Sequence, residues 1–191
     1  MKDKMPLRRE EGFTLVELMI AIIILALIVF AAFNIMDVNI KAGAIYTMQS
    51  ELSQGLKNAS DAMVDQLRAA HTFTTANVSD VVFTSYVTGT NDLYDVEFFL
   101  ENGQLIYRAK KVSDGPLGSG DDKVLASGIS GLKIIYYDSA GTQLNDAINN
   151  PTVPAGSLGS IIGLEIELTM IESYGETSLS DTSTTAVRVK R

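Results

Sequence analysis

The longest apolar segment of the chain runs from Phe13 to Phe33 and contains one charged residue, Glu17. About 20 apolar residues form a helix long enough to cross a bilayer, and the apolar side chains here fall on every face of such a helix. Inserting a carboxylate within a membrane span costs about 2.5–3.5 kcal/mol of free energy on insertion scales, so such a group usually has a partner and a function. The pattern predicts a membrane-spanning helix over residues 13–36 in which Glu17 is the residue to explain.

The helical pattern continues beyond this span, because apolar residues recur at spacings of three and four with charged residues between them. The apolar stripe consists of Ile35, Val38, Ala42, Ile45, Leu52, Leu56, Ala59, Met63, Leu67 and Ala70. This periodicity predicts an amphipathic helix over residues 37–71 that packs one face on a core. His71 is the only histidine, and we expect it at the C-terminus of this helix, where a cation is favourable.

The remaining residues, 72–191, have the pattern of strands and turns. Asn102-Gly103 separates two apolar runs and is the strongest hairpin signal in the sequence. Strict alternation over residues 161–171 predicts a half-buried antiparallel strand. Further strands are expected at residues 81–87, 94–100, 105–111, 132–137 and 186–191, and loops at 113–123, 146–160 and 174–184. A long helix followed by antiparallel sheet predicts an α+β fold.

Charge predicts how the chain is oriented in a membrane. Residues 1–12 carry four basic side chains, and no comparable cluster follows the apolar segment. The positive-inside rule therefore predicts a cytoplasmic N-terminus and export of the residues beyond the span. The net charge of −8 argues against a general nucleic-acid partner, and with no cysteine the chain has no disulfide or cysteine-based metal site.

The six residues Gly12-Phe13-Thr14-Leu15-Val16-Glu17 follow a short basic leader and begin the apolar run. This arrangement resembles the type IV prepilin signal. The resemblance implies a pilin-like fold, and it implies that a prepilin peptidase removes residues 1–12 by cutting between Gly12 and Phe13 and then methylates the amine of Phe13. It further implies assembly through the apolar helix, with other major and minor pilins or pseudopilins, an inner-membrane assembly platform and membrane lipid as partners.

The chemistry of these positions agrees with that resemblance. Cleavage creates an α-amine with a reference pKa of about 7.7–8.0, which is largely cationic at neutral pH. Phe13 and Glu17 are one helical turn apart, so the amine of one subunit can neutralise Glu17 of a staggered neighbour. A pair of this kind fixes axial register more than it adds stability. Glu17 and Phe13 are therefore the expected registry residues.

Later segments are similar to the larger minor subunits of this family. Three of them are V-E-F-F-L-E-N-G-Q-L-I-Y-R, L-K-I-I-Y-Y-D-S-A-G and V-R-V-K-R. They resemble the J-type pseudopilin of type II secretion and the W-type minor pilin. Major pilins often have a helix proline and a C-terminal disulfide, and this chain has neither at the corresponding places. The resemblance therefore implies a minor subunit near the filament tip, in either a pilus or a secretion pseudopilus.

Other interpretations fit the sequence less well. An ordinary secretory signal would cut at Ala42-Gly43-Ala44, far beyond its usual place, and a plain membrane anchor would carry a binding domain that never polymerises. Ser130 and Lys133 match S-x-x-K, a nucleophile motif that needs a helix. Two further sets were considered: Asp114, Asp121 and Asp122 as calcium ligands, and Arg108, Lys110 and Lys111 as DNA contacts. We expect a solvated loop and a solvated face instead, with no enzyme activity, cofactor or metal.

Overall fold

The computed structural model describes residues 14–86, 92–175 and 177–189, and the chain divides into two compact units, residues 1–45 and 46–191. Its first element is α1, a helix over Leu15–Arg68 that contributes residues to both units. No proline occurs between Pro6 and Pro116, so nothing in the sequence breaks the hydrogen-bond ladder of this helix. The predicted long N-terminal helix is confirmed.

The C-terminal half of α1 carries the buried stripe that the sequence predicts. Its buried apolar residues are Met48, Leu52, Leu56, Ala59, Met63, Val64 and Leu67. Ile35 and Val38, from the beginning of the predicted stripe, are 64% exposed and lie in the first unit. The stripe therefore covers a core only within residues 46–68.

The position expected for His71 is wrong. Helix α1 ends at Arg68, and His71 lies in strand β1 (Ala70–Ala76), where its ring packs 5.8 Å from that of Tyr86. The residues after His71 are Thr72 and Phe73, which favour extended backbone. The helix therefore ends at Arg68, before the last apolar residue of the helical pattern, because the residues that follow favour a strand.

The first sheet is an antiparallel meander of five strands in sequence order. It contains β1, β2 (Asp80–Tyr86), β3 (Leu93–Glu101), β4 (Gln104–Lys111) and β5 (Asp122–Ser127). The β3–β4 turn confirms the predicted hairpin, because Asn102 and Gly103 have φ of 50° and 73°, the left-handed backbone that a two-residue turn requires. Strand β5 begins inside the region expected to be a loop, whose other residues include the short 3₁₀ turns Val112–Asp114 and Ser119–Asp121.

The second sheet has three antiparallel strands in the order β6 (Ile129–Tyr137), β7 (Gly163–Tyr174) and β8 (Thr177–Arg188). Strand β7 confirms the predicted alternation, with Leu164, Ile166 and Leu168 buried on one face. The loop expected at residues 174–184 is wrong, because β8 pairs with β7 along its whole length. Its Ser/Thr composition suggests a loop, yet threonine is β-branched and favours a strand wherever a neighbouring backbone supplies the hydrogen bonds.

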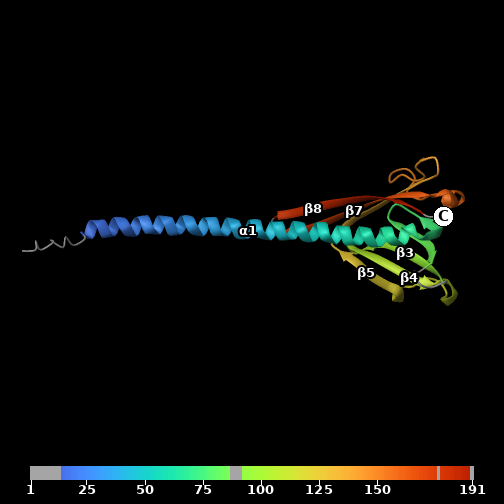
Figure 1. The fold of residues 1–191 in the computed structure, drawn as a ribbon, viewed down its shortest axis with the longest axis horizontal. Helices are drawn as coiled ribbons and strands as arrows, with labels where there is room; N and C mark the ends of the chain where they lie inside the picture. Colours follow the sequence, from blue (N-terminus) through green and yellow to red (C-terminus); the bar gives the residue numbers. More distant parts are fainter. Residues whose placement is uncertain (1–13, 87–91, 176, 190–191) are drawn as a thin grey trace, which may run out of the picture. The chain divides into compact units, whose positions relative to one another are not determined.

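In the second unit, the C-terminal part of α1 packs along both sheets, and in the view of Figure 1 β7 and β8 appear on one side of it and β3, β4 and β5 on the other. The core is rich in aromatic rings: Phe73 packs on Phe83 at 5.9 Å and on Tyr136 at 6.3 Å, and Phe83 stacks on Phe98 at 6.1 Å. Hydrogen bonds from the helix also reach β8, because Ser53 Oγ donates to Asp181 Oδ2 at 2.8 Å. The predicted α+β fold, a long helix packed on antiparallel sheet, is confirmed.

The side chain of Asn145 is hydrogen-bonded to the backbone of β6 and is almost fully buried. Its Oδ1 accepts from the Tyr136 N–H at 2.9 Å, and its Nδ2 donates to the Ile134 carbonyl at 2.9 Å. We predict that Asn145→Ala lowers the free energy of unfolding by about 1–3 kcal/mol, because two buried backbone groups lose their partner. Urea unfolding of the full chain in detergent, followed by circular dichroism, measures this loss. Asn149→Ala, which removes an exposed side chain, is the control and should change stability by less than about 0.5 kcal/mol.

Candidate functional site

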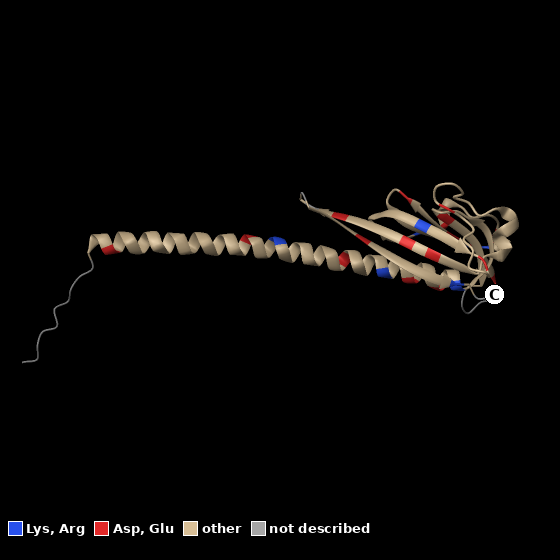
Figure 2. Ribbon diagram, turned by 90° about the horizontal axis from the view of Figure 1, so that it is seen from above, with Lys and Arg blue, Asp and Glu red and all other residues tan. Residues whose placement is uncertain are grey.

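The N-terminal half of α1 presents an apolar surface around its whole circumference. From residue 15 to residue 40 its large apolar side chains are 44–74% exposed. By length and composition this helix is able to cross a membrane. Figure 2 shows a long stretch of it without any acidic or basic residue, between one acidic position at its beginning and the ion pair of Asp37 and Lys41. A surface of this kind is stable in lipid or against other apolar helices, and it indicates membrane anchoring.

Glu17 is part of a reciprocal hydrogen-bond set with Thr14 at the beginning of α1. The Thr14 N–H and the Thr14 hydroxyl both donate to Glu17 Oε2 at 2.9 Å, and the Glu17 N–H donates to Thr14 Oγ1 at 3.3 Å. Thr14 immediately precedes the helix and Glu17 is its third residue, so the two residues form a capping box. The carboxylate thus satisfies a backbone donor that would otherwise be unpaired in an apolar environment.

Thr14 is the residue of this site that the sequence prediction did not include. The signal was present, because Thr14-Leu15-Val16-Glu17 is the T-x-x-E pattern of a capping box in front of an apolar run. Both hydrogen bonds from Thr14 reach Oε2, and no hydrogen bond to Oε1 is found within the described residues. One carboxylate oxygen therefore holds the helix terminus while the other stays available. Gly12 and Phe13, the predicted cleavage and methylation residues, lie outside the described residues.

The three basic residues considered as DNA contacts all have carboxylate partners. Arg108 contacts Glu97 at 2.8 Å and Asp122 at 2.5 Å, and its guanidinium lies 4.8 Å from the centre of the Phe99 ring. Lys111 contacts Asp92 at 2.9 Å, and Lys110 lies 3.9 Å from Asp121. Hydrogen bonding to Asp122, together with the charge of Glu97, raises the pKa of Arg108. These side chains stabilise the outer face of the first sheet rather than offer a basic surface.

The three aspartates that could serve as calcium ligands all accept hydrogen bonds from nearby groups, and Asp114 Oδ1 accepts from the Ser113 hydroxyl at 2.9 Å. Asp122 accepts from Arg108, and Asp121 Oδ2 accepts from the Gly118 N–H at 3.3 Å. Within the residues that the structure describes, no group of three or more acidic, histidine or cysteine side chains is arranged to hold a metal ion. The loop carboxylates therefore form hydrogen bonds and ion pairs with residues of the sheet and of its adjoining turns.

The S-x-x-K match lies in β6 and does not form a nucleophile site. Ser130 Oγ donates to the Thr169 carbonyl at 3.2 Å, and Lys133 Nζ contacts Glu167 Oε2 at 3.2 Å. The motif requires a helix to bring its serine and lysine together, whereas these two side chains are bound to separate partners on β7. The match is a coincidence of sequence.

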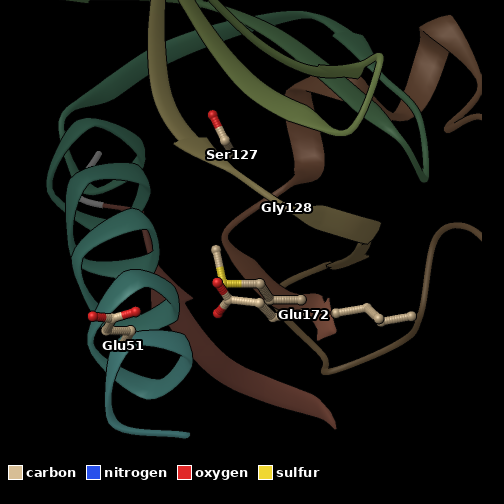
Figure 3. A pocket seen from close by; sticks show the side chains of 6 residues that line it. Glu51, Ser127, Gly128 and Glu172 are labelled. Atoms are coloured by element: carbon tan, nitrogen blue, oxygen red, sulfur yellow. The ribbon is translucent and has the colours of Figure 1, made fainter. Parts of the chain in front are cut away.

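A cavity of about 330 Å³ opens between α1, the β5–β6 junction and the end of β7 (Figure 3). It is lined by Glu51, Ser127, Gly128, Met170, Ile171 and Glu172. Met170 also packs against Gly55, where an added Cβ would come within 3.2 Å of its methyl group, so glycine permits the close approach of helix and strand. These six residues provide two carboxylates and one hydroxyl beside apolar side chains, and in Figure 3 the Ser127 hydroxyl lies apart from both Glu51 and Glu172.

The described residues thus contain a helix able to cross a membrane, capped by Thr14 and Glu17 and followed by an α+β domain. The profile of the prokaryotic N-terminal methylation motif matches residues 7–33. The fold is similar to that of a type IV-like pilin from Thermus thermophilus, with a TM-score of 0.55 and 11% identity over 72% of this chain and 95% of that one. No curated protein sequence matches the chain. The motif and the fold together support a type IV pilin-like family, as the sequence predicts.

Proposed function

We propose that the chain is a minor pilin or pseudopilin subunit that a prepilin peptidase processes and that assembles through its apolar helix into a type IV pilus or a type II secretion pseudopilus. The observation that carries this proposal is the combination of the methylation motif over residues 7–33 with a pilin-like fold. Proteins that combine these two features are structural subunits. The motif implies processing by the peptidase and assembly with other pilins.

The proposal assigns roles to three residues. The peptidase cuts between Gly12 and Phe13, the new amine of Phe13 is methylated, and Glu17 of a neighbouring subunit neutralises that amine. The capping box is compatible with the pairing of Glu17 and a neighbour's amine, because Thr14 binds Oε2 of Glu17 and leaves Oε1 for that amine. Because Glu17 Oε2 lies 2.9 Å from the Thr14 nitrogen, the carboxylate sits beside the first turn of its own helix, and the neighbour's amine must reach it there. Glu17 then caps its own helix and sets the register of the next one.

The same proposal assigns a function to each segment of the chain. Residues 1–12 form the leader, residues 13–36 the membrane and filament-core helix, residues 37–71 the amphipathic segment and residues 72–191 the β-rich domain. The basic leader stays in the cytoplasm, and the domain lies on the outer side of the inner membrane until assembly moves it into the filament. The long apolar surface of α1 supports this arrangement, because lipid covers it before assembly and neighbouring helices cover it afterwards.

Within the filament we place the subunit near the tip, where it helps to start assembly. The absence of a helix proline and of any cysteine, together with the similarity of its later segments to J-type and W-type subunits, supports this position. Quantitative proteomics of purified filaments tests it. We expect the protein in filaments at a small fraction of the main subunit. Equal abundance along the fibre would make it the main pilin, and its absence from filaments would favour a membrane-anchored binding domain that does not polymerise.

A further inference from the structure

The two sheets have four outer strands, β1, β5, β6 and β8, and the chain itself protects three of them. The segment after Asn150 covers β1, because Val153 N–H donates to the Ala76 carbonyl at 2.9 Å. Strand β6 is covered by Asn145 and by Leu144, whose N–H donates to the Tyr136 carbonyl at 2.8 Å. Strand β5 is six residues long, begins with two charged residues and has an irregular register with β4. Coverage, charge, short length and bulges are the usual means of protecting an edge.

In the part of the chain that the structure describes, strand β8 lacks a covering segment, a short length and a bulge, and its two charged residues are Asp181 and, at its last position, Arg188. It is 12 residues long, contains no proline, glycine or lysine, and pairs with β7 in an unbroken register. Its acidic residue, Asp181, accepts from Ser53 of α1 and so points toward the helix. Within the described residues, no backbone hydrogen bond from another segment reaches β8 on the side away from β7.

Local hydrogen bonds identify which residues of β8 face this open side. The Thr182 N–H donates to Asp181 Oδ1 at 2.9 Å, so it does not face β7. The carbonyl of Thr169, directly opposite Thr182, accepts from Ser130 on the other side of β7. Just after the strand, Val189 N–H donates to the Ile162 carbonyl, which places odd-numbered residues toward the β7 side. The backbone N–H and C=O groups of Ser180, Thr182, Thr184 and Ala186 therefore point outward, and of these donors the Thr182 N–H is already bonded to Asp181.

We propose that this outer edge of β8 binds an extended strand of a different filament protein, which adds to the three-stranded sheet. Outward N–H and C=O groups alternate at every second residue, and only another extended backbone matches that spacing. The outward-facing residues carry small, uncharged side chains, which suit cross-strand pairing, as the 3.2 Å contact between the Thr169 and Thr182 hydroxyls shows. This inference rests on the proposed function, because the strand comes from an assembly partner.

Charge favours a different protein over a second copy of this chain. Each copy has a net charge of −8, so two copies placed edge to edge repel each other. The neighbouring strand β7 adds Glu165 and Glu167 on the exposed face, partnered by Tyr137 at 3.0 Å and by Lys133 at 3.2 Å. Although these two glutamates have partners and β8 ends on Arg188, the net charge of −8 favours a partner strand that is uncharged or basic.

Hydrogen exchange on the full-length protein tests the inference, comparing the detergent-solubilised subunit with assemblies recovered through a tag on it. We expect the outward amides of Ser180, Thr184 and Ala186 to exchange at least about tenfold more slowly in the assembly, together with amides near the start of α1. Protection of the helix alone would overturn the strand-addition proposal and leave the proposed function intact. No protection of either segment would overturn both, because the protein would then not assemble.

Variants at Thr184 provide the matched comparison. Thr184→Pro removes an outward N–H without removing a bond to β7, so it should abolish the protection while the fold persists. Thr184→Lys places a charge on the same edge and carries the test if the proline variant does not fold; Thr184→Val retains the N–H and should behave as the native chain. A photo-crosslinker at Ser180 then identifies the occupant. Crosslinks to a second copy of this chain, or native protection in both Thr184→Pro and Thr184→Lys, would overturn the proposal.

Discussion

Gly12→Val leaves the precursor uncut, with all of residues 1–12 still attached, while the protein remains in the membrane. Glycine lacks a Cβ and lets a protease approach the backbone closely, whereas valine introduces a branched side chain next to the bond to be cleaved. A displacement of the reacting groups by about 1 Å can lower a rate about a hundredfold, so we expect a loss of at least that size. Electrophoresis of membrane fractions after pulse labelling measures precursor and mature chain separately.

The membrane helix itself serves as the internal control for that variant. Its apolar residues are unchanged, so Gly12→Val should be recovered in the membrane fraction at the native level. A second control, Gly43→Val, places the same substitution on α1 at a position where no atom lies within 4 Å of an added Cβ. It should be processed normally. Normal processing of Gly12→Val would contradict the assigned cleavage site.

Glu17→Leu inserts into the membrane at least as well as the native chain and is still cleaved, but its recovery in filaments falls at least tenfold. Removing the carboxylate spares about 2.5–3.5 kcal/mol of insertion cost, so an assembly defect cannot come from poor insertion. It comes from the neighbour's amine, which is left buried without a partner at a cost of about 3–5 kcal/mol. Immunoblotting of sheared filaments against the membrane fraction gives the ratio.

Because Glu17 is part of a capping box, two further variants can separate the effect of its charge from its effect as a helix cap. Glutamine also occupies the third position of a capping box, so Glu17→Gln keeps an acceptor for Thr14 and removes only the charge. We expect Glu17→Gln to assemble as poorly as Glu17→Leu. Thr14→Val keeps the carboxylate and removes its hydroxyl partner, and we expect it to assemble better than either variant. Native assembly of Glu17→Gln would mean that Glu17 acts as a helix cap and not as a charge.

Much of the fold follows from local patterns that the sequence displays directly. The apolar period gives α1, the alternation around Leu164–Leu168 gives β7, and Asn102-Gly103 gives the hairpin, because each depends on residues close together in the chain. Strand β8 could not be predicted in this way. Its residues are mostly serine and threonine, and their strand conformation depends on hydrogen bonds to β7. The end of α1 was misplaced for a related reason, since Ala70 is buried as the helical period predicts but lies in β1.

In the candidate site, too, the sequence identifies some of the residues, and their partners are identified only by the structure. Glu17 stands out in the sequence because a charge in an apolar run is costly, and the structure adds the partner, Thr14, that holds one of its oxygens. The partners of Arg108 come from β3 and β5, which the sequence cannot bring together without the sheet register. The open edge of β8 is likewise visible only when the other three edges are seen to be covered.

Mass spectrometry of the native protein extracted from membranes shows directly whether this chain is processed as a prepilin. We predict an N-terminal peptide that begins at Phe13 and carries one methyl group on its α-amine. An intact chain beginning at Met1, or a chain that begins at Ile45 after an ordinary signal-peptidase cut, would contradict it.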